Sequence, residues 1–256
     1  MTIRAWGAAT ATLTAGLLLA GCQGLDRAKP VPPPVSLAPS SNGVETLPVE
    51  QALERTQNAL RGADSFRFNG CRGKRVGGPW DCAEYQSVGN DFIGLLKPAD
   101  GEGDILAGRA EILSVGGHYY MRPDAAWWEQ EFDDTRAGAD AIVKYVGDRW
   151  VDTEKFPRYG AVFRPAAVIA ELDSIDKVAK GGSTEVNGQA AFSFGVEKSF
   201  DSIVVAATGE PYPLQLNLFT TTAALSDFGT EFGQIAAPPA ESVVDLTTVL
   251  LWAAKH

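Results

Sequence analysis

The chain changes its hydrophobic period at Gly62, and this change constrains the fold more than any other feature. Before it, residues that fit one face recur at helical spacing, and Pro48 suits the first turn of a helix. These residues are Ala52, Leu53, Thr56, Ala59 and Leu60. After Gly62, apolar and polar residues alternate between short glycine-rich turns, as in half-buried strands. The order predicts a helix that ends at Gly62 and an antiparallel sheet that follows it.

A meander of about five strands is predicted next. It covers residues 65–68, 80–88, 92–96, 105–115 and 118–121. Gly116-Gly117, before the last of these, is a hairpin signal. Helical spacing then returns in residues 124–147 and in a second helix opened by Arg164-Pro165.

The alternating pattern resumes after these helices. Further strands are predicted at residues 184–186, 189–194, 201–208, 214–219 and 225–235, and a short terminal helix at 243–254. Asn187-Gly188 is the strongest hairpin signal in the chain. The sum is an α+β fold, a strongly curved antiparallel sheet or incomplete β-barrel wrapped around a few helices.

The N-terminal residues predict the location of the protein. An apolar run of residues 5–19 follows Arg4 and ends in Leu19-Ala20-Gly21-Cys22, the pattern of a bacterial lipoprotein signal and its lipobox. The run is too short and too rich in small residues to span a bilayer. The alternative is an ordinary secretory signal with an incidental cysteine. We expect cleavage before Cys22 and fatty acyl chains, such as palmitate, on that residue, because two chains suffice for stable anchoring.

The sequence divides into three parts. Residues 1–21 are the expected signal peptide, and residues 22–46 hold the lipidated cysteine and a proline-rich linker that favours extended polyproline II. Residues 47–256 form the expected domain. The linker is interpreted as a spacer from the cytoplasmic membrane, on its extracytoplasmic face, with a proline-rich recognition motif as the alternative.

The other two of the three cysteines, Cys71 and Cys82, bracket a glycine-rich turn. An exported location permits a disulfide across this hairpin. A redox or metal site is the alternative, and only two histidines, His118 and His256, are present to support a metal. No metal or other cofactor is expected. The net charge of −10 makes nucleic acid an improbable partner.

Enzyme chemistry has little support in the sequence. No nucleophile elbow, zinc-protease motif or phosphate-binding glycine loop is present. His118 is interpreted as an exposed or strand-paired residue. An acidic cluster beside Trp127-Trp128 fits a solvated helix start, with glycoside hydrolysis as the alternative. It comprises Glu129, Glu131, Asp133 and Asp134.

Apolar stripes supply candidates for the lining of a lipid cavity. Leu214, Leu216 and Leu218 are expected on one face of a strand, because alternate residues of a strand share a face. The other candidates come from neighbouring strands and from the second helix: Ile93, Leu95, Ile112, Met121, Val168, Ile169, Leu172, Ile203 and Val205. The alternative is that these residues simply fill a core.

The C-terminal part of the chain resembles envelope lipoproteins of actinobacteria. The resemblance lies in IVVAATGEPYPLQLNLF (203–219) and in LSDFGTEFGQIAAPPAESVVDL (225–246). The helix that leads into SFRF (65–68) and the motif YVGDRW (145–150) resemble the same proteins. Such proteins are similar to the LolA/LolB carriers and to the LppX/LprG lipid-binding lipoproteins.

The resemblance implies an incomplete barrel whose helices enclose an apolar cavity for acyl chains, without catalytic residues. The expected function is a noncatalytic, membrane-anchored lipoprotein that binds a lipid or other amphiphile and acts as a local relay in the cell envelope. The alternative is an interaction or sensor module with a filled core, whose partner is another envelope protein. For that alternative we expect an exposed aromatic patch around Trp127 and Trp128.

Overall fold

The computed structural model describes residues 40–73, 80–99, 105–131, 135–156, 161–197 and 199–255, without the side chains of Trp80 and Glu131. The first elements are a 3-10 turn, η1 (Val44–Thr46), and the predicted helix α1 (Val49–Arg61). The buried face of α1 consists of Ala52, Leu53, Thr56 and Leu60, which confirms most of the helical stripe. The lipobox and most of the linker lie outside the described residues.

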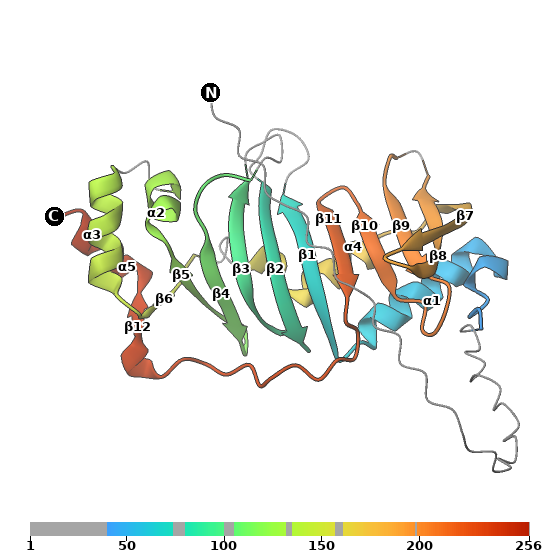
Figure 1. Cartoon of the computed structure of the whole chain (residues 1–256), viewed down its shortest axis with the longest axis horizontal. Coiled ribbons are helices and arrows are strands. Elements are labelled where there is room, and N and C mark those ends of the chain that lie inside the picture. The colour runs from blue at the N-terminus through green and yellow to red at the C-terminus, as the bar shows by residue number, and fades with distance from the viewer. Residues whose placement is uncertain are drawn as a thin grey trace, which may run out of the picture. The chain divides into compact units, whose positions relative to one another are not determined.

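Twelve strands form one sheet (Figure 1). In chain order they are β1 (Ser65–Gly73), β2 (Trp80–Val88), β3 (Asp91–Ala99), β4 (Ala110–Val115), β5 (His118–Pro123), β6 (Trp150–Asp152), β7 (Val178–Val186), β8 (Gln189–Val196), β9 (Ser202–Ala206), β10 (Pro213–Asn217), β11 (Thr221–Ser226) and β12 (Val243–Asp245). Their order across the sheet is β12-β6-β5-β4-β3-β2-β1-β11-β10-β9-β8-β7. Neighbouring strands are antiparallel except β12 and β6. In the described part of the chain β12 and β7 stay unpaired with each other, so the sheet is open and the predicted α+β class is confirmed.

The helices gather over the core. Figure 1 shows α1 and α4 (Pro165–Asp173) behind the sheet, while α2 (Ala125–Glu131), α3 (Arg136–Val146) and α5 (Leu246–Ala253) lie near β5, β6 and β12. Two short turns, η3 (Ala161–Phe163) and η4 (Ala240–Ser242), complete the elements. The Gln57 amide of α1 donates to the carbonyl oxygens of Leu172 and Ile175. The two helices are thereby joined into one cover.

A glycine allows close contact between strands at the centre of the sheet. Gly94 of β3 pairs with Tyr85 of β2 and with Ile112 of β4. A Cβ at this position would lie 2.1 Å from the Glu84 carbonyl oxygen and 2.5 Å from the Tyr85 Cβ. Only a residue without a side chain permits this approach, and such glycines mark bends in curved sheets.

The disulfide is confirmed. Cys71 and Cys82 are direct partners in the β1–β2 register and are bonded to each other. The bond therefore staples the hairpin at a position where the two strands already pair.

Several predicted strands have the wrong bounds. The strand predicted at 65–68 extends to Gly73, and the one predicted at 184–186 begins at Val178. Two others show a local cause. The strand expected at 105–115 begins at Ala110, because Gly108 has a φ of +99° and packs against the Trp127 backbone. The strand expected at 225–235 ends at Ser226, because Asp227 adopts a left-handed φ of 55° and accepts a 2.9 Å hydrogen bond from Arg67 Nε. The chain then runs along the strand ends to β12, with the 3-10 turn η4 as the only regular element described on the way (Figure 1).

Candidate functional site

The structure brings most of the predicted lining residues together on the helix-covered face of the sheet. Eight of them are almost fully buried in one hydrophobic cluster: Ile112, Met121, Val168, Leu172, Ile203, Val205, Leu216 and Leu218. Ile169 is partly buried and packs against the same cluster. These nine residues come from four strands (β4, β5, β9 and β10, with Leu218 directly after β10) and one helix, so the sheet and α4 share one apolar interior.

Ile93 and Leu95 lie on the opposite face of the sheet. Their neighbours Phe92 and Leu96 are the ones that enter the core, at 0% and 2% exposure. Since successive residues of a strand face opposite sides, Ile93 and Leu95 point away from it. The run from Phe92 to Leu96 is apolar on both faces, so its sequence alone does not distinguish the inner face.

The shared face predicted for Leu214, Leu216 and Leu218 is wrong at Leu214. The register between β9 and β10 shifts between Pro213 and Gln215, so Leu214 occupies an irregular position in the strand. It packs in a separate small cluster with Ala191 and Ala206. A β-bulge changes the direction of a side chain without altering the alternating sequence, which explains the error.

Aromatic rings occupy the centre of the inner face. Tyr85 stacks on Phe68 with centroids 4.9 Å apart and lies 5.0 Å from the Phe92 ring. The ring of Phe163, from η3, packs edge-on against Phe68 at 6.2 Å. The alternation of Phe66, Arg67 and Phe68 predicts a strand, and the structure buries both phenylalanines, at 2% and 0% exposure.

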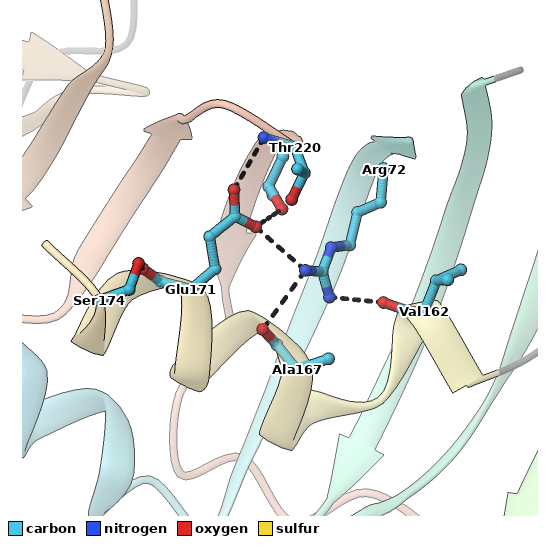
Figure 2. A network of polar contacts seen from close by, with 7 residues as sticks. Arg72, Val162, Ala167, Glu171, Ser174 and Thr220 are labelled. Carbon is cyan, nitrogen blue, oxygen red and sulfur yellow. Dashed lines mark hydrogen bonds and ion pairs between the residues drawn. The ribbon is translucent and has the colours of Figure 1, made fainter. Parts of the chain in front are cut away.

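A buried ion pair joins α4 to the sheet (Figure 2). Arg72 Nη2, at the end of β1, lies 3.0 Å from Glu171 Oε2 and also donates to the Ala167 carbonyl, while Nη1 donates to the Val162 carbonyl. Glu171 also accepts hydrogen bonds from the Thr220 backbone N–H at 2.8 Å and from the Thr221 hydroxyl. The side chains of Arg72 and Glu171 are only 9% and 14% exposed. This network was not predicted from the sequence.

Among the buried side-chain atoms that lack a hydrogen-bond partner in the described part of the chain are the Tyr85 hydroxyl and Arg72 Nε. Burial raises the pKa of the Tyr85 phenol, and the charge of nearby Arg72 acts against that rise. A buried polar group without a partner destabilises the folded protein by about 1–3 kcal/mol. A ligand that accepts hydrogen bonds from Tyr85 and Arg72 would remove this cost.

The structure gives less support to the other sites considered from the sequence, the tryptophan pair and His118. Trp127 and Trp128 are 3% and 0% exposed, so the exposed aromatic patch expected around them is wrong. His118 pairs with Val115 across a hairpin and its Nδ1 lies 3.3 Å from Glu154, as expected for an exposed, strand-paired residue.

The acidic cluster is only partly described, because Asp133 and Asp134 lie outside the described residues. Glu129 lies 3.8 Å from Arg136 Nη1.

Within the described ranges, no group of three or more histidine, cysteine or acidic residues is placed to hold a metal ion. Over the same ranges, no helix has the length and apolar character needed to cross a membrane.

A separate surface pocket of about 450 Å³ opens between the C-terminal half of α1 and the turn before β10. Its lining is Arg55, Asn58, Ala59, Gly62, Glu210, Pro211 and Tyr212. It lies outside the apolar interior, and none of the predicted cavity residues contributes to it.

Several solved structures resemble this chain. The crystal structure of LprF from Mycobacterium bovis is similar to this chain with a TM-score of 0.48 and 12% sequence identity, over 79% of this chain and all of that one. No residue of this chain takes a role from it. No family model and no curated protein matches the sequence.

Proposed function

We propose that the protein is a noncatalytic lipoprotein, anchored to the outer face of the cytoplasmic membrane through Cys22, that binds a lipid or other amphiphile in its interior. It would serve as a local relay in the cell envelope. The lipobox at residues 19–22 supports the anchor. The resemblance of residues 203–246 to actinobacterial envelope lipoproteins supports the class of protein.

The observation that carries the proposal is that the buried Tyr85 hydroxyl and the buried Arg72 Nε each lack a hydrogen-bond partner among the described residues. The Tyr85 ring packs against Phe68 and Phe92, the Phe163 ring packs against Phe68, and the charge of Arg72 lies close enough to act on the Tyr85 hydroxyl. An amphiphile has the matching chemistry, because its polar group accepts hydrogen bonds from a phenol and a guanidinium while its chains bury apolar area. That burial contributes about 25 cal/mol per Å².

The nine lining residues of the sheet and α4 supply the surface for the chains. They extend from Met121 and Ile112 on one side of the aromatic rings to Ile203 and Val205 on the other. Polar neighbours in this cluster are few, so the position near Tyr85 and Arg72 would fix the orientation of the ligand.

The test compares the wild-type chain with Tyr85→Phe, each purified from native membranes and extracted for mass spectrometry of bound lipid. Tyr120→Phe, which changes a tyrosine on the other face of the sheet, is the matched control. We expect copurifying amphiphile in the wild type and in Tyr120→Phe, and several-fold less in Tyr85→Phe. In the ligand-free protein, Tyr85→Phe should preserve or raise stability, because it removes an unpaired buried hydroxyl.

Opposite effects on binding and stability separate a ligand contact from simple damage to the core. Absence of copurifying amphiphile from all three proteins would overturn the proposal and favour an interaction module with a filled core. Equal retention in wild type and Tyr85→Phe would remove Tyr85 from the binding site.

A further inference from the structure

Two phenylalanine side chains project into solvent at one end of the sheet. Phe200, in the turn between β8 and β9, is 93% exposed, and Phe219, in the turn between β10 and β11, is 57% exposed. Figure 1 shows these two turns at the same end of the strands. The last pair of the β9–β10 register joins Ser202 to Asn217, so two further steps place Phe200 opposite Phe219. The Asn217 amide also donates to the Phe200 carbonyl oxygen at 3.4 Å.

Val162 adds a third exposed apolar side chain to this end. It is 40% exposed, and its carbonyl accepts a hydrogen bond from Arg72. Gly73, which follows Arg72 in β1, donates its N–H to the carbonyl of Thr220, the residue after Phe219. We name Val162, Phe200 and Phe219 the apolar end of the sheet.

The length of the N-terminal linker indicates what covers the apolar end. The described chain starts at the opposite end of β9, where Ser41 forms a bridge with Thr208. From Thr208 back to Ser202 the strand spans roughly 23 Å. From Cys22 to residue 40 the chain has about 18 residues, and a chain of that length can reach at most about 60 Å. The tether is long enough to let the apolar end face the membrane that holds Cys22.

We propose that the apolar end docks into the boundary between headgroups and acyl chains of the anchoring membrane. This inference rests on the lipid anchor of the proposed function. Exposed phenylalanines at turns gain free energy by burial at this boundary, and two phenylalanines with the neighbouring Val162 of η3 give the domain one apolar end to orient toward the bilayer. The Arg72–Glu171 network lies at the same end, so docking turns that part of the interior toward the bilayer.

The test is a map of contacts with a photoactivatable lipid. The wild-type chain from native membranes is reconstituted into phosphatidylethanolamine–phosphatidylglycerol vesicles that contain a lipid with a diazirine in its acyl chain. After irradiation, labelled peptides are identified by mass spectrometry. We expect labels concentrated in the two turns, and about tenfold less in Phe200→Ser/Phe219→Ser, because full burial of a single phenylalanine changes a partition constant by at least that factor. Leu251→Ser, at a residue that is 59% exposed on α5, should leave the map unchanged.

Labels spread evenly over the domain, or equal labelling of the turns in both proteins, would overturn the inference. So would a dimer of the wild-type chain in detergent that the double substitution dissociates, since a second copy would then cover the phenylalanines. The mass of the N-terminal peptide reports lipidation of Cys22 separately, and bound lipid is measured in the same samples. Failure of the anchor, of ligand binding and of docking therefore give three different results.

Discussion

Glu171→Ala should destabilise the protein far more than the loss of an ordinary glutamate. Glu171 sits in α4, with a side chain that is 14% exposed, and it contacts the Arg72 guanidinium, the Thr220 N–H and the Thr221 hydroxyl. Truncation leaves a charge and two hydrogen-bond donors buried without an acceptor. Breaking one side of a buried ion pair costs about 3–5 kcal/mol.

A change of this size is easy to measure. In a domain of this size, 1 kcal/mol shifts the melting temperature by about 2–4 °C, so Glu171→Ala should lower it by roughly 10 °C. Equilibrium unfolding in urea, followed by circular dichroism, gives the free energy directly when the slope is unchanged.

Asp173→Ala provides the control on the same helix. Asp173 Oδ2 lies 3.0 Å from Arg61 Nε, but these side chains are 30% and 44% exposed. An exposed pair contributes only about 0.2–1 kcal/mol, and the variant should lose no more than that. In the double variant Arg72→Met/Glu171→Leu, stability should recover in part, because no unpaired charge remains. A loss below about 1 kcal/mol in Glu171→Ala, or equal to that in Asp173→Ala, would refute the reasoning.

Three further predictions concern the hairpin, the bend and the last helix. Replacing both Cys71 and Cys82 by alanine should lower the free energy of unfolding by about 2–3 kcal/mol, measured in urea, because the unfolded chain is no longer cross-linked over a separation of 11 residues; no change would contradict this. Gly94→Val should prevent folding or lower the free energy of unfolding by at least about 3 kcal/mol, since its Cβ would lie 2.1 Å from a carbonyl oxygen of β2. Gly89→Ala should lower it much less, because no atom lies within 4 Å of the added Cβ. Desolvation acts to raise the pKa of Asp245, but hydrogen bonds from Thr247, Lys155 and the Thr248 N–H outweigh it and lower that pKa. Its stabilising effect is therefore present above its ordinary value of 3.8 and is lost as the pH falls through the folded value, so the stability difference from Asp245→Ala should shrink below about pH 4 in acid titrations.

Elements whose local residue pattern fits only one type of structure could be predicted from the sequence. The helical stripe before Gly62 predicted α1, and Asn187-Gly188 predicted the β7–β8 hairpin. The disulfide followed from the placement of two cysteines about a turn. In each case local spacing determines the structure, and distant contacts only stabilise it.

The inner face of the sheet required information that local spacing does not contain. The run from Phe92 to Leu96 is apolar on both sides, and Leu214 is redirected by a change of register. The short strand β12 forms where the C-terminal segment returns to pair with β6, and β6 itself forms by pairing with the distant β5. Long-range contacts of this kind override local propensity.

The polar part of the candidate site was equally inaccessible. Arg72 and Glu171 are 99 residues apart, and nothing in the neighbourhood of either residue indicates a buried partner. Tyr85 resembles any other aromatic residue of a strand until the structure places its hydroxyl in the interior.

Native mass spectrometry of the intact wild-type chain, released gently from its membrane, tests the central claim most directly. We expect a species whose mass exceeds that of the lipidated chain by one amphiphile, and loss of that species in Tyr85→Phe but not in Tyr120→Phe. A wild-type chain that carries its N-terminal lipid and no further mass would contradict the claim that the interior binds an amphiphile.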